Sequence, residues 1–206
     1  MSDDPPEFSL RIPESWYELE LDQSRRKKRF QQAVDEQVAV NPALAPARDA
    51  IIDRLLGFAA DAEEKGALAG ATLWTVIDGV EVAANLMVFS VGRHRPDDVD
   101  AELAGLEDHL RHRSSVDVGA RTVDRVPLPA GPAVRLRLLA GSEIENAGNG
   151  RSRPASGIVV ETIQHWLPVP DADHTLVISG TTPCLAYGDE LAEVFDSIAA
   201  SLRLLQ

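Results

Sequence analysis

Cysteine is nearly absent from this sequence: Cys184 is the only one among 206 residues. A disulfide bond within the sequence and a metal site built on cysteines are therefore excluded. Aromatic residues make up only 5% of the sequence, so the predicted core consists mainly of Val, Leu, Ile and Ala.

Positive charge is also scarce. The sequence carries 20 Lys and Arg against 33 Asp and Glu, a formal net charge of −13. Because Lys and Arg must neutralise phosphates, this balance argues against general binding to nucleic acid or to an anionic membrane. We therefore expect neither a nucleic-acid partner nor a membrane partner.

Long hydrophobic runs are absent as well. The longest, near residues 80–91, is interrupted by Glu81 and Asn85 and is too short to span a bilayer. Residues 1–10 are acidic and lack the apolar segment of a secretory signal, so a cytoplasmic location is expected. The proportions of hydrophobic residues, 44%, and charged residues, 26%, are typical of a globular protein, and one domain over 1–206 is predicted.

Alternating apolar and polar residues predict the strands. Asp78-Gly79 separates two such segments, 69–77 and 80–91, and indicates a two-residue hairpin turn that needs positive φ. Residues 8–21 are predicted to form one opening strand with a kink at Pro13. Other strands are predicted at 122–128, 133–139, 158–167 and 174–182. About six strands with short connections indicate an α+β fold with a mainly antiparallel sheet.

Helical periodicity predicts a helical insert over 24–66, a helix over 96–113 and a final helix over about 187–204. The final helix carries one apolar stripe, formed by Leu191, Phe195, Ile198 and Leu202. Arg203 is expected in its last turn, where the helix dipole favours a cation.

Both ends of the chain carry a recognisable pattern. The segment FSLRIP (8–13) is followed closely by Trp16, and the last strand ends in TTP (181–183) before FDSIAASL (195–202). This pattern resembles the PsbP/Mog-like superfamily. The resemblance implies a non-enzymatic adaptor role, as in a regulator of a small GTPase, an extrinsic photosystem subunit or chaperones of secreted bacterial effectors.

Cations in two segments are the candidate partner contacts. Five of them begin a predicted helix, where they oppose its dipole, so another group must tolerate or use them. Two arginines lie in 141–157, which is predicted to be a mobile loop. The candidates are Arg25, Arg26, Lys27, Lys28, Arg29, Arg151 and Arg153. The alternative is that these cations bind no partner: the first group would lie on a helix face exposed to solvent, and the two arginines in a loop exposed to solvent. Residues 1–7 are also predicted to be loose.

Candidates for chemistry are few. His165, His174 and Cys184 flank neighbouring predicted strands and could form a Cys–His site in a cleft between sheet and helices. The alternative for Cys184 is a buried, inert thiol. His94, Asp108, His109 and His112 could bind a metal, or could simply form a polar helix end. Nucleotide-binding glycine motifs and a G-x-S-x-G turn are absent, and we expect no catalytic residue, metal or cofactor.

The sequence therefore predicts a cytoplasmic bacterial protein-interaction module, an adaptor or chaperone-like protein that binds another protein and is not an enzyme. One alternative is a small-ligand binder or enzyme that uses His165, His174 and Cys184. Another is a structural subunit of a larger assembly. The oligomeric state stays open.

Overall fold

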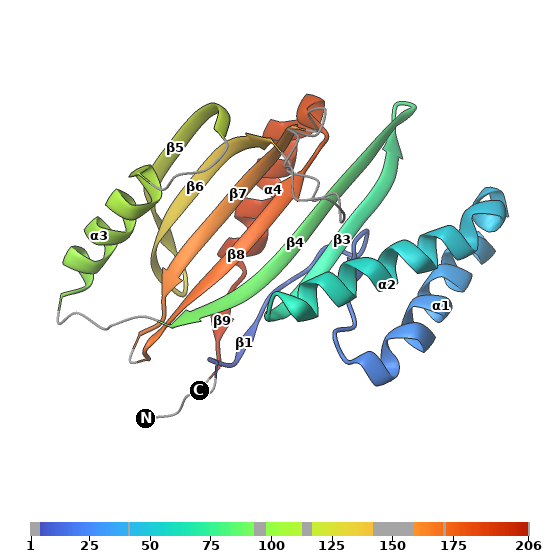
Figure 1. Ribbon diagram of the computed structural model, residues 1–206, viewed down its shortest axis with the longest axis horizontal. Coiled ribbons are helices and arrows are strands. Elements are labelled where there is room, and N and C mark those ends of the chain that lie inside the picture. The colour runs from blue at the N-terminus through green and yellow to red at the C-terminus, as the bar shows by residue number, and fades with distance from the viewer. Residues whose placement is uncertain are drawn as a thin grey trace, which may run out of the picture.

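The structure is a computed structural model and describes residues 5–40, 42–92, 98–112, 117–141, 159–170 and 172–205. In chain order the elements are β1 (Phe8–Ser9), β2 (Tyr17–Glu18), α1 (Gln23–Val40), the 3-10 helix η1 (Pro42–Ala47), α2 (Arg48–Glu64), β3 (Ala67–Ile77), β4 (Val80–Gly92), α3 (Val99–His112), β5 (Asp117–Leu128), β6 (Gly131–Gly141), β7 (Val159–Pro168), β8 (His174–Thr182), the 3-10 helix η2 (Leu185–Tyr187), α4 (Gly188–Ala200) and β9 (Arg203–Leu204). The predicted α+β class is confirmed (Figure 1).

One antiparallel sheet of seven strands dominates the fold, in the order β2-β3-β4-β8-β7-β6-β5. The hairpins β3–β4, β5–β6 and β7–β8 pair strands that follow each other in the chain. The late strand β8 inserts between β4 and β7, so the two halves of the chain meet at the centre of the sheet. The predicted hairpin turn at Asp78-Gly79 is confirmed, because both residues have positive φ, 51° and 80°.

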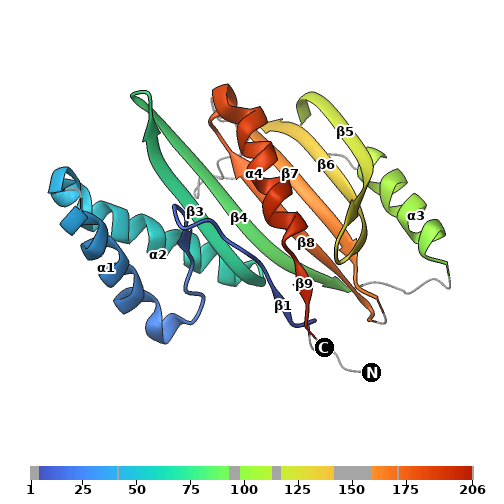
Figure 2. The same cartoon turned by 180° about the vertical axis from the view of Figure 1, so that it is seen from behind.

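The helices cover both faces of the sheet (Figure 1, Figure 2). On one face α4 packs against β7 and β8. On the opposite face α2 packs against β3, while α3 packs against β5 and β6. The insert that carries α1 and α2 leaves the sheet after β2 and returns at β3, which pairs with β2.

The main core lies between the sheet and α4. The predicted apolar stripe of this helix is buried there: Leu191, Phe195, Ile198 and Leu202 are all at most 5% exposed. The ring of Phe195 meets Trp16 edge-on, with the ring centroids 5.8 Å apart. Smaller apolar clusters lie under α1 with α2, and under α3.

Two local predictions were wrong. The final helix ends at Ala200, and Arg203 lies in β9 instead of the last helical turn. Residues 8–21 do not form one strand, since β1 pairs with β9 and β2 joins the large sheet. The backbone N–H of Leu205 donates to the Glu7 carbonyl at 2.9 Å, next to the pairing of β1 with β9. Each error concerns pairing between the two chain ends, which local sequence patterns do not encode.

Within the described residues, no helix is long and apolar enough to cross a membrane.

Gly180 on β8 is the point where α4 comes closest to the sheet. A Cβ at this position would overlap the ring of Phe195, whereas a Cβ at Gly105 on α3 would meet nothing within 4 Å. We expect Gly180→Ala to lower the free energy of unfolding by about 1–3 kcal/mol through overpacking. Gly105→Ala should raise it by about 0.5–1 kcal/mol, because alanine favours the helix. Urea unfolding of both variants tests this, and equal effects would contradict the assigned packing.

Candidate functional site

The basic residues at the start of α1 follow a strong N-terminal cap. Asp22 accepts the backbone N–H and the hydroxyl of Ser24 at 2.8 and 2.6 Å, and the Arg25 guanidinium at 2.8 Å. These hydrogen bonds, with Ser24 contributing most, lower the pKa of Asp22 to about 2. A negative charge at the helix N-terminus is thus what offsets the run of cations that follows.

Arg26 differs from its neighbours because it is buried, with its side chain only 7% exposed. Its guanidinium donates to the carbonyls of Glu20 and Leu21 and to the Glu63 carboxylate at 3.1, 2.7 and 2.6 Å. Arg26 therefore ties α1 to the end of α2 and to the chain after β2, and it cannot contact a partner.

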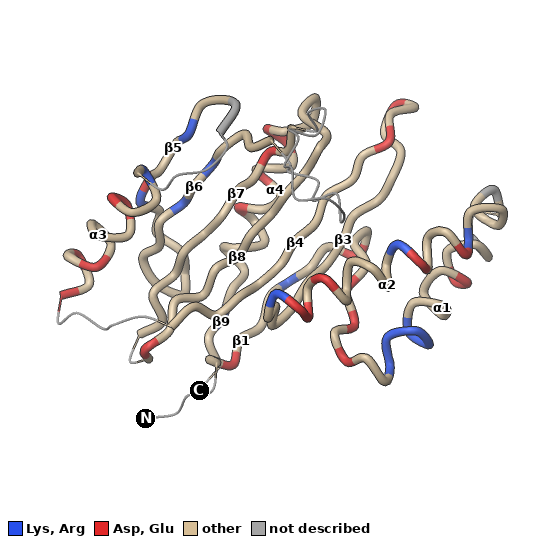
Figure 3. Tube along the Cα trace, viewed as in Figure 1, with Lys and Arg blue, Asp and Glu red and all other residues tan. Residues whose placement is uncertain are grey.

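Lys27, Lys28 and Arg29 are exposed, and Figure 3 shows the cations gathered at the start of α1. Arg29 lies beside a groove of about 440 Å³ between α1, β2 and the outer edge of β3. Arg151 and Arg153 lie outside the described residues, as does 142–157, most of the loop predicted over 141–157.

The three residues of the alternative site do not come together. His174 begins β8, and Cys184 follows Thr182 at the other end of that strand. His174 and Thr182 are eight residue-to-residue steps apart along the strand, roughly 26 Å at about 3.3 Å per step. His165 on β7 pairs with Ile178, midway between them.

Cys184 has a structural role at the end of β8. The backbone N–H of Ala83 donates to its Sγ at 3.3 Å, and the thiol lies 3.4 Å from the Glu81 carbonyl. Next to it, the Thr182 hydroxyl donates to the Ala83 carbonyl at 2.7 Å. These side chains continue the contact between β8 and β4 beyond the last paired backbone residues, Asn85 and Thr181.

His165 belongs to a buried polar cluster under α4. It is 2% exposed, its Nε2 lies 2.9 Å from Asp196 Oδ1, and Arg135 Nε reaches the same oxygen at 2.7 Å. Arg137 on β6 similarly bridges the buried Glu161 and the exposed Asp189, at 2.5 and 2.6 Å. Both pairs attach α4 to β6 and β7, so these charges serve the fold.

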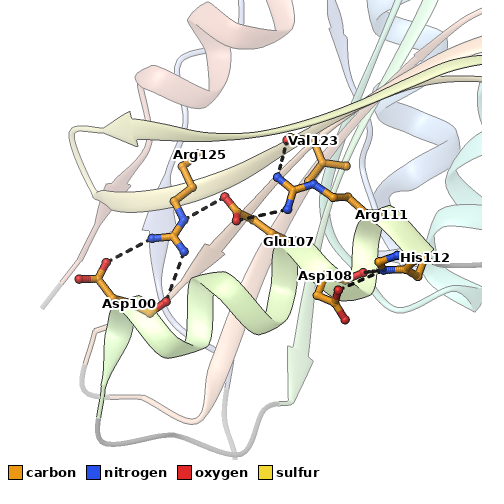
Figure 4. Close-up of polar contacts among 7 residues, drawn as sticks. All are labelled: Asp100, Glu107, Asp108, Arg111, His112, Val123 and Arg125. Carbon is orange, nitrogen blue, oxygen red and sulfur yellow. Dashed lines mark hydrogen bonds and ion pairs between the residues drawn. The ribbon is translucent and has the colours of Figure 1, made fainter.

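The polar residues of α3 are likewise used within the fold (Figure 4). Arg125 on β5 contacts Glu107 at 2.9 Å and Asp100 at 3.3 Å, while Arg111 donates to the Val123 carbonyl at 3.2 Å. His112 turns back onto Asp108 of its own helix, with its Nδ1 3.1 Å from Asp108 Oδ1. Within the described ranges, no three His, Cys, Asp or Glu residues are grouped closely enough to hold a metal, and His94 lies outside those ranges.

Among the described residues, the end of the β3–β4 hairpin carries strongly exposed apolar side chains, a feature that the sequence did not lead us to predict. β3 pairs with β2 only at Ala71 and Thr72, and β4 pairs with β8 only from Asn85 onward. Residues 73–77 and 80–84 therefore form a two-stranded ribbon that extends past the neighbouring strands, here called the hairpin end (Figure 1, Figure 2). A hint in the sequence is the length of this hairpin, because β3 and β4 have 11 and 13 residues and β8 has 9.

Side chains at the tip of the hairpin end are strongly exposed: Val76 at 62%, Ile77 at 41% and Val80 at 48%. The side facing β8 is braced, since Cys184 contacts Glu81 and the Tyr187 hydroxyl lies 3.4 Å from the Ile77 carbonyl. The side facing away from β8 borders the groove beside Arg29, which Trp74 and Thr75 also line. The hairpin end thus combines exposed apolar side chains with an adjacent groove.

Protein-family models, curated proteins and solved structures were compared with the chain, and none of them matches. The resemblance to the PsbP/Mog-like superfamily therefore stays a prediction.

Substitutions of Arg26 and Lys27 test which cations stabilise the fold. Arg26→Ala removes the donor to two backbone carbonyls and to Glu63, so we expect the free energy of unfolding to fall by about 1–3 kcal/mol. Lys27→Ala should change it by less than about 0.5 kcal/mol, because this side chain is exposed. Thermal and urea unfolding measure both, and a destabilisation by Lys27→Ala as large as that by Arg26→Ala would contradict these assignments.

Asp196 should make the stability depend on pH. Burial raises the pKa of Asp196, but the hydrogen bonds and charges of His165 and Arg135 outweigh burial and hold the pKa below its ordinary value of 3.8. The stabilisation is fully present above pH 3.8 and is lost as the pH falls through the lower pKa of the folded state. At pH 7, Asp196→Asn should cost about 1–2 kcal/mol, a modest effect because solvent screens this half-exposed carboxylate.

Urea unfolding from pH 7 down to pH 3 tests the role of Asp196. The difference between the wild type and Asp196→Asn should shrink toward the acid end of the range. A difference that stays constant with pH would show that the carboxylate charge does not contribute. Asp189→Asn is the control, since Asp189 is exposed and its ion pair with Arg137 should contribute less.

Proposed function

We propose that this chain is a cytoplasmic protein-interaction module of the adaptor or chaperone-like kind, and that it is not an enzyme. The observation that carries the proposal is the hairpin end, which holds Val76, Ile77 and Val80 in solvent at one tip of the molecule. Exposed β-branched residues grouped on one projecting element favour contact with another protein, because burying them removes apolar surface from water.

The shape of the hairpin end supports the same function. Its strands are joined by a two-residue turn with both residues at positive φ, a geometry that matches the twist of the strands. Thr182 and Cys184 brace the ribbon from β8. A contact surface that is already ordered loses little conformational freedom on binding, which favours affinity.

The basic start of α1 is the second part of the proposed contact surface. Lys27, Lys28 and Arg29 are exposed, and Arg29 borders the groove that continues to the hairpin end. Arg26 drops out of the set of contacts because it is buried within the fold. Steering by these exposed cations would act on acidic residues of the partner outside the groove, and mainly on the rate of association.

The alternative of an enzyme or ligand site at His165, His174 and Cys184 has less support. Each of these residues has its own contact, with Asp196, Ser90 and Ala83 respectively, and they are spread along the sheet. The Ser90 hydroxyl lies 3.0 Å from His174 Nδ1, but this contact does not involve Cys184, whose thiol contacts Ala83 and Glu81.

Affinity capture from the native host tests the proposed function. A tagged wild-type chain and a variant with Val76→Ser, Ile77→Ser and Val80→Ser are compared by quantitative mass spectrometry. We expect a stoichiometric partner to be recovered with the wild type and reduced at least about tenfold with the variant, because buried apolar contacts carry most interface energy.

Val99→Ser is the matched control for this experiment. Val99 on α3 is 54% exposed, a fraction similar to the 62% of Val76. It lies on an element far from the hairpin end (Figure 1). It should leave recovery unchanged. Recovery of no partner by the wild type would refute the interaction module, and equal loss with Val99→Ser would refute the hairpin end as the contact.

A further inference from the structure

The two edges of the large sheet differ in how well they are protected against pairing with another strand. The outer edge of β5 carries Arg121 and Arg125, and Pro127, which has no N–H to offer. The unpaired segment of β3, 73–77, reads LWTVI and contains no charged residue and no proline (Figure 3). Sheet proteins protect their free edges with charge or proline, so an edge left unprotected indicates a strand-binding site.

The backbone of this β3 segment presents hydrogen-bonding groups outward. The Leu19 N–H donates to the Gly70 carbonyl at 2.8 Å, so Gly70 faces β2. In an antiparallel strand the groups of alternate residues face the same side, hence those of Trp74 and Val76 also face outward. Among the described residues, no strand pairs with β3 on this side beyond Thr72.

A groove lies beside this edge. Its volume is about 440 Å³, and it is lined by β2 with the residues just before it, 14–16, by Trp74 and Thr75 of β3, and by one face of α1. The α1 wall includes Arg29 and Glu36, which are two helical turns apart on the same face. An extended segment of five residues, about 17 Å long, would cover the edge from Leu73 to Ile77.

We propose that the outer edge of β3 binds an extended segment of a partner protein as an added antiparallel strand, in line with β2. This inference rests on the proposed interaction function and names its binding mode. The partner's main-chain N–H and C=O groups would pair with Trp74 and Val76. Its alternate side chains would lie against the exposed Val76 on one face of the sheet and Thr75 on the other.

The charge around the edge favours a basic partner segment. Glu14, Glu18 and Glu36 line the groove against the single cation Arg29, and Asp78 and Glu81 are exposed at the nearby turn. A lysine or arginine in the partner strand would therefore be attracted to this edge, and an acidic residue would be repelled.

A second copy of this chain fits the edge less well. α1 lies beyond the outer edge of β3 in both views (Figure 1, Figure 2). Antiparallel pairing of two β3 edges about a twofold axis would place both copies of α1 on the same face of the joined sheet, next to the new strand pair. A single extended segment brings no such helix, so it is the occupant that the geometry favours.

Two substitutions at Val76 distinguish the contribution of its backbone N–H to peptide binding from the contribution of its side chain. Val76→Pro removes the outward N–H, whereas the bonds from Thr75 and Ile77 to β4 stay in place. Val76→Ser keeps the N–H and removes the apolar side chain. The probe is a phage-displayed library of random linear decapeptides selected on the wild-type chain, with affinities of the selected peptides measured by fluorescence anisotropy.

We expect the selected peptides to alternate β-branched or aromatic residues and to carry a Lys or Arg. Val76→Pro should weaken them at least about tenfold, which corresponds to one lost hydrogen bond, and more than Val76→Ser does. Glu36→Lys should weaken peptides with a basic residue and leave a peptide with that residue replaced by Ser unaffected. Equal binding to the wild type and to Val76→Pro would overturn the proposal.

Amide hydrogen exchange on the wild type gives a test that does not depend on folding of the proline variant. Addition of a selected peptide should slow exchange at Trp74 and Val76, and leave Arg125 on the opposite edge unchanged. Protection elsewhere without protection at Trp74 and Val76 would overturn strand addition. A dimer of the purified chain that Val76→Pro converts to monomer would also overturn it, because the occupant would then be a second copy.

Failure of this inference can be told apart from failure of the proposed function. A host partner captured equally by the wild type and by Val76→Pro refutes docking at the β3 edge but leaves the interaction module standing. Recovery of no host partner, together with no selected peptide, refutes both.

Discussion

The close approach of α4 to the sheet is the contact on which the rest of the structure depends. Gly180 leaves room for the Phe195 ring directly over β8, and the same ring packs edge-on against Trp16 near the start of the chain. An amphipathic helix and a half-buried sheet cannot bury their apolar faces separately, so this packing creates the main core. It also places residues 203–204 where β9 can pair with β1.

Charged side chains between α4 and the sheet help to determine how the helix sits. Arg135 and His165 meet at Asp196, and Arg137 reaches both Glu161 and Asp189. Such pairs cost desolvation and contribute little net stability, but a misplaced helix would leave them unpaired at a high cost. His165, one of the three residues of the alternative site, thus pairs with Asp196 under a helix.

The large sheet leaves one edge unprotected, and the proposed strand binding rests on this edge. β2 has only two residues, so within the described residues β3 beyond Thr72 has no paired strand on its outer side. α1 overhangs that side and turns the open edge into a groove with walls. The uncharged edge and the projecting apolar tip lie on one hairpin, acidic residues of neighbouring elements surround them, and the proposed binding surface rests on this combination.

Local pattern in the sequence predicted much of the fold. The Asp78-Gly79 turn, the long hairpin strands and the apolar stripe of the last helix follow from φ preferences and residue periodicity, which are local properties. Arg26 shows where such information was present but unused. It precedes Phe30 and Val34 by four and eight residues, so it lies on the buried stripe of α1, unlike Lys27.

The sequence by itself determined the fold class, the hairpins and the apolar faces of the helices, because each depends on residues within a few turns or one strand pair. Only the tertiary structure decided which cations are buried, that His165, His174 and Cys184 lie apart, and that the end of β3 has no neighbouring strand. These outcomes depend on strand order and on the packing of segments far apart in the chain. They arise from the balance of many distant contacts, which no local pattern specifies.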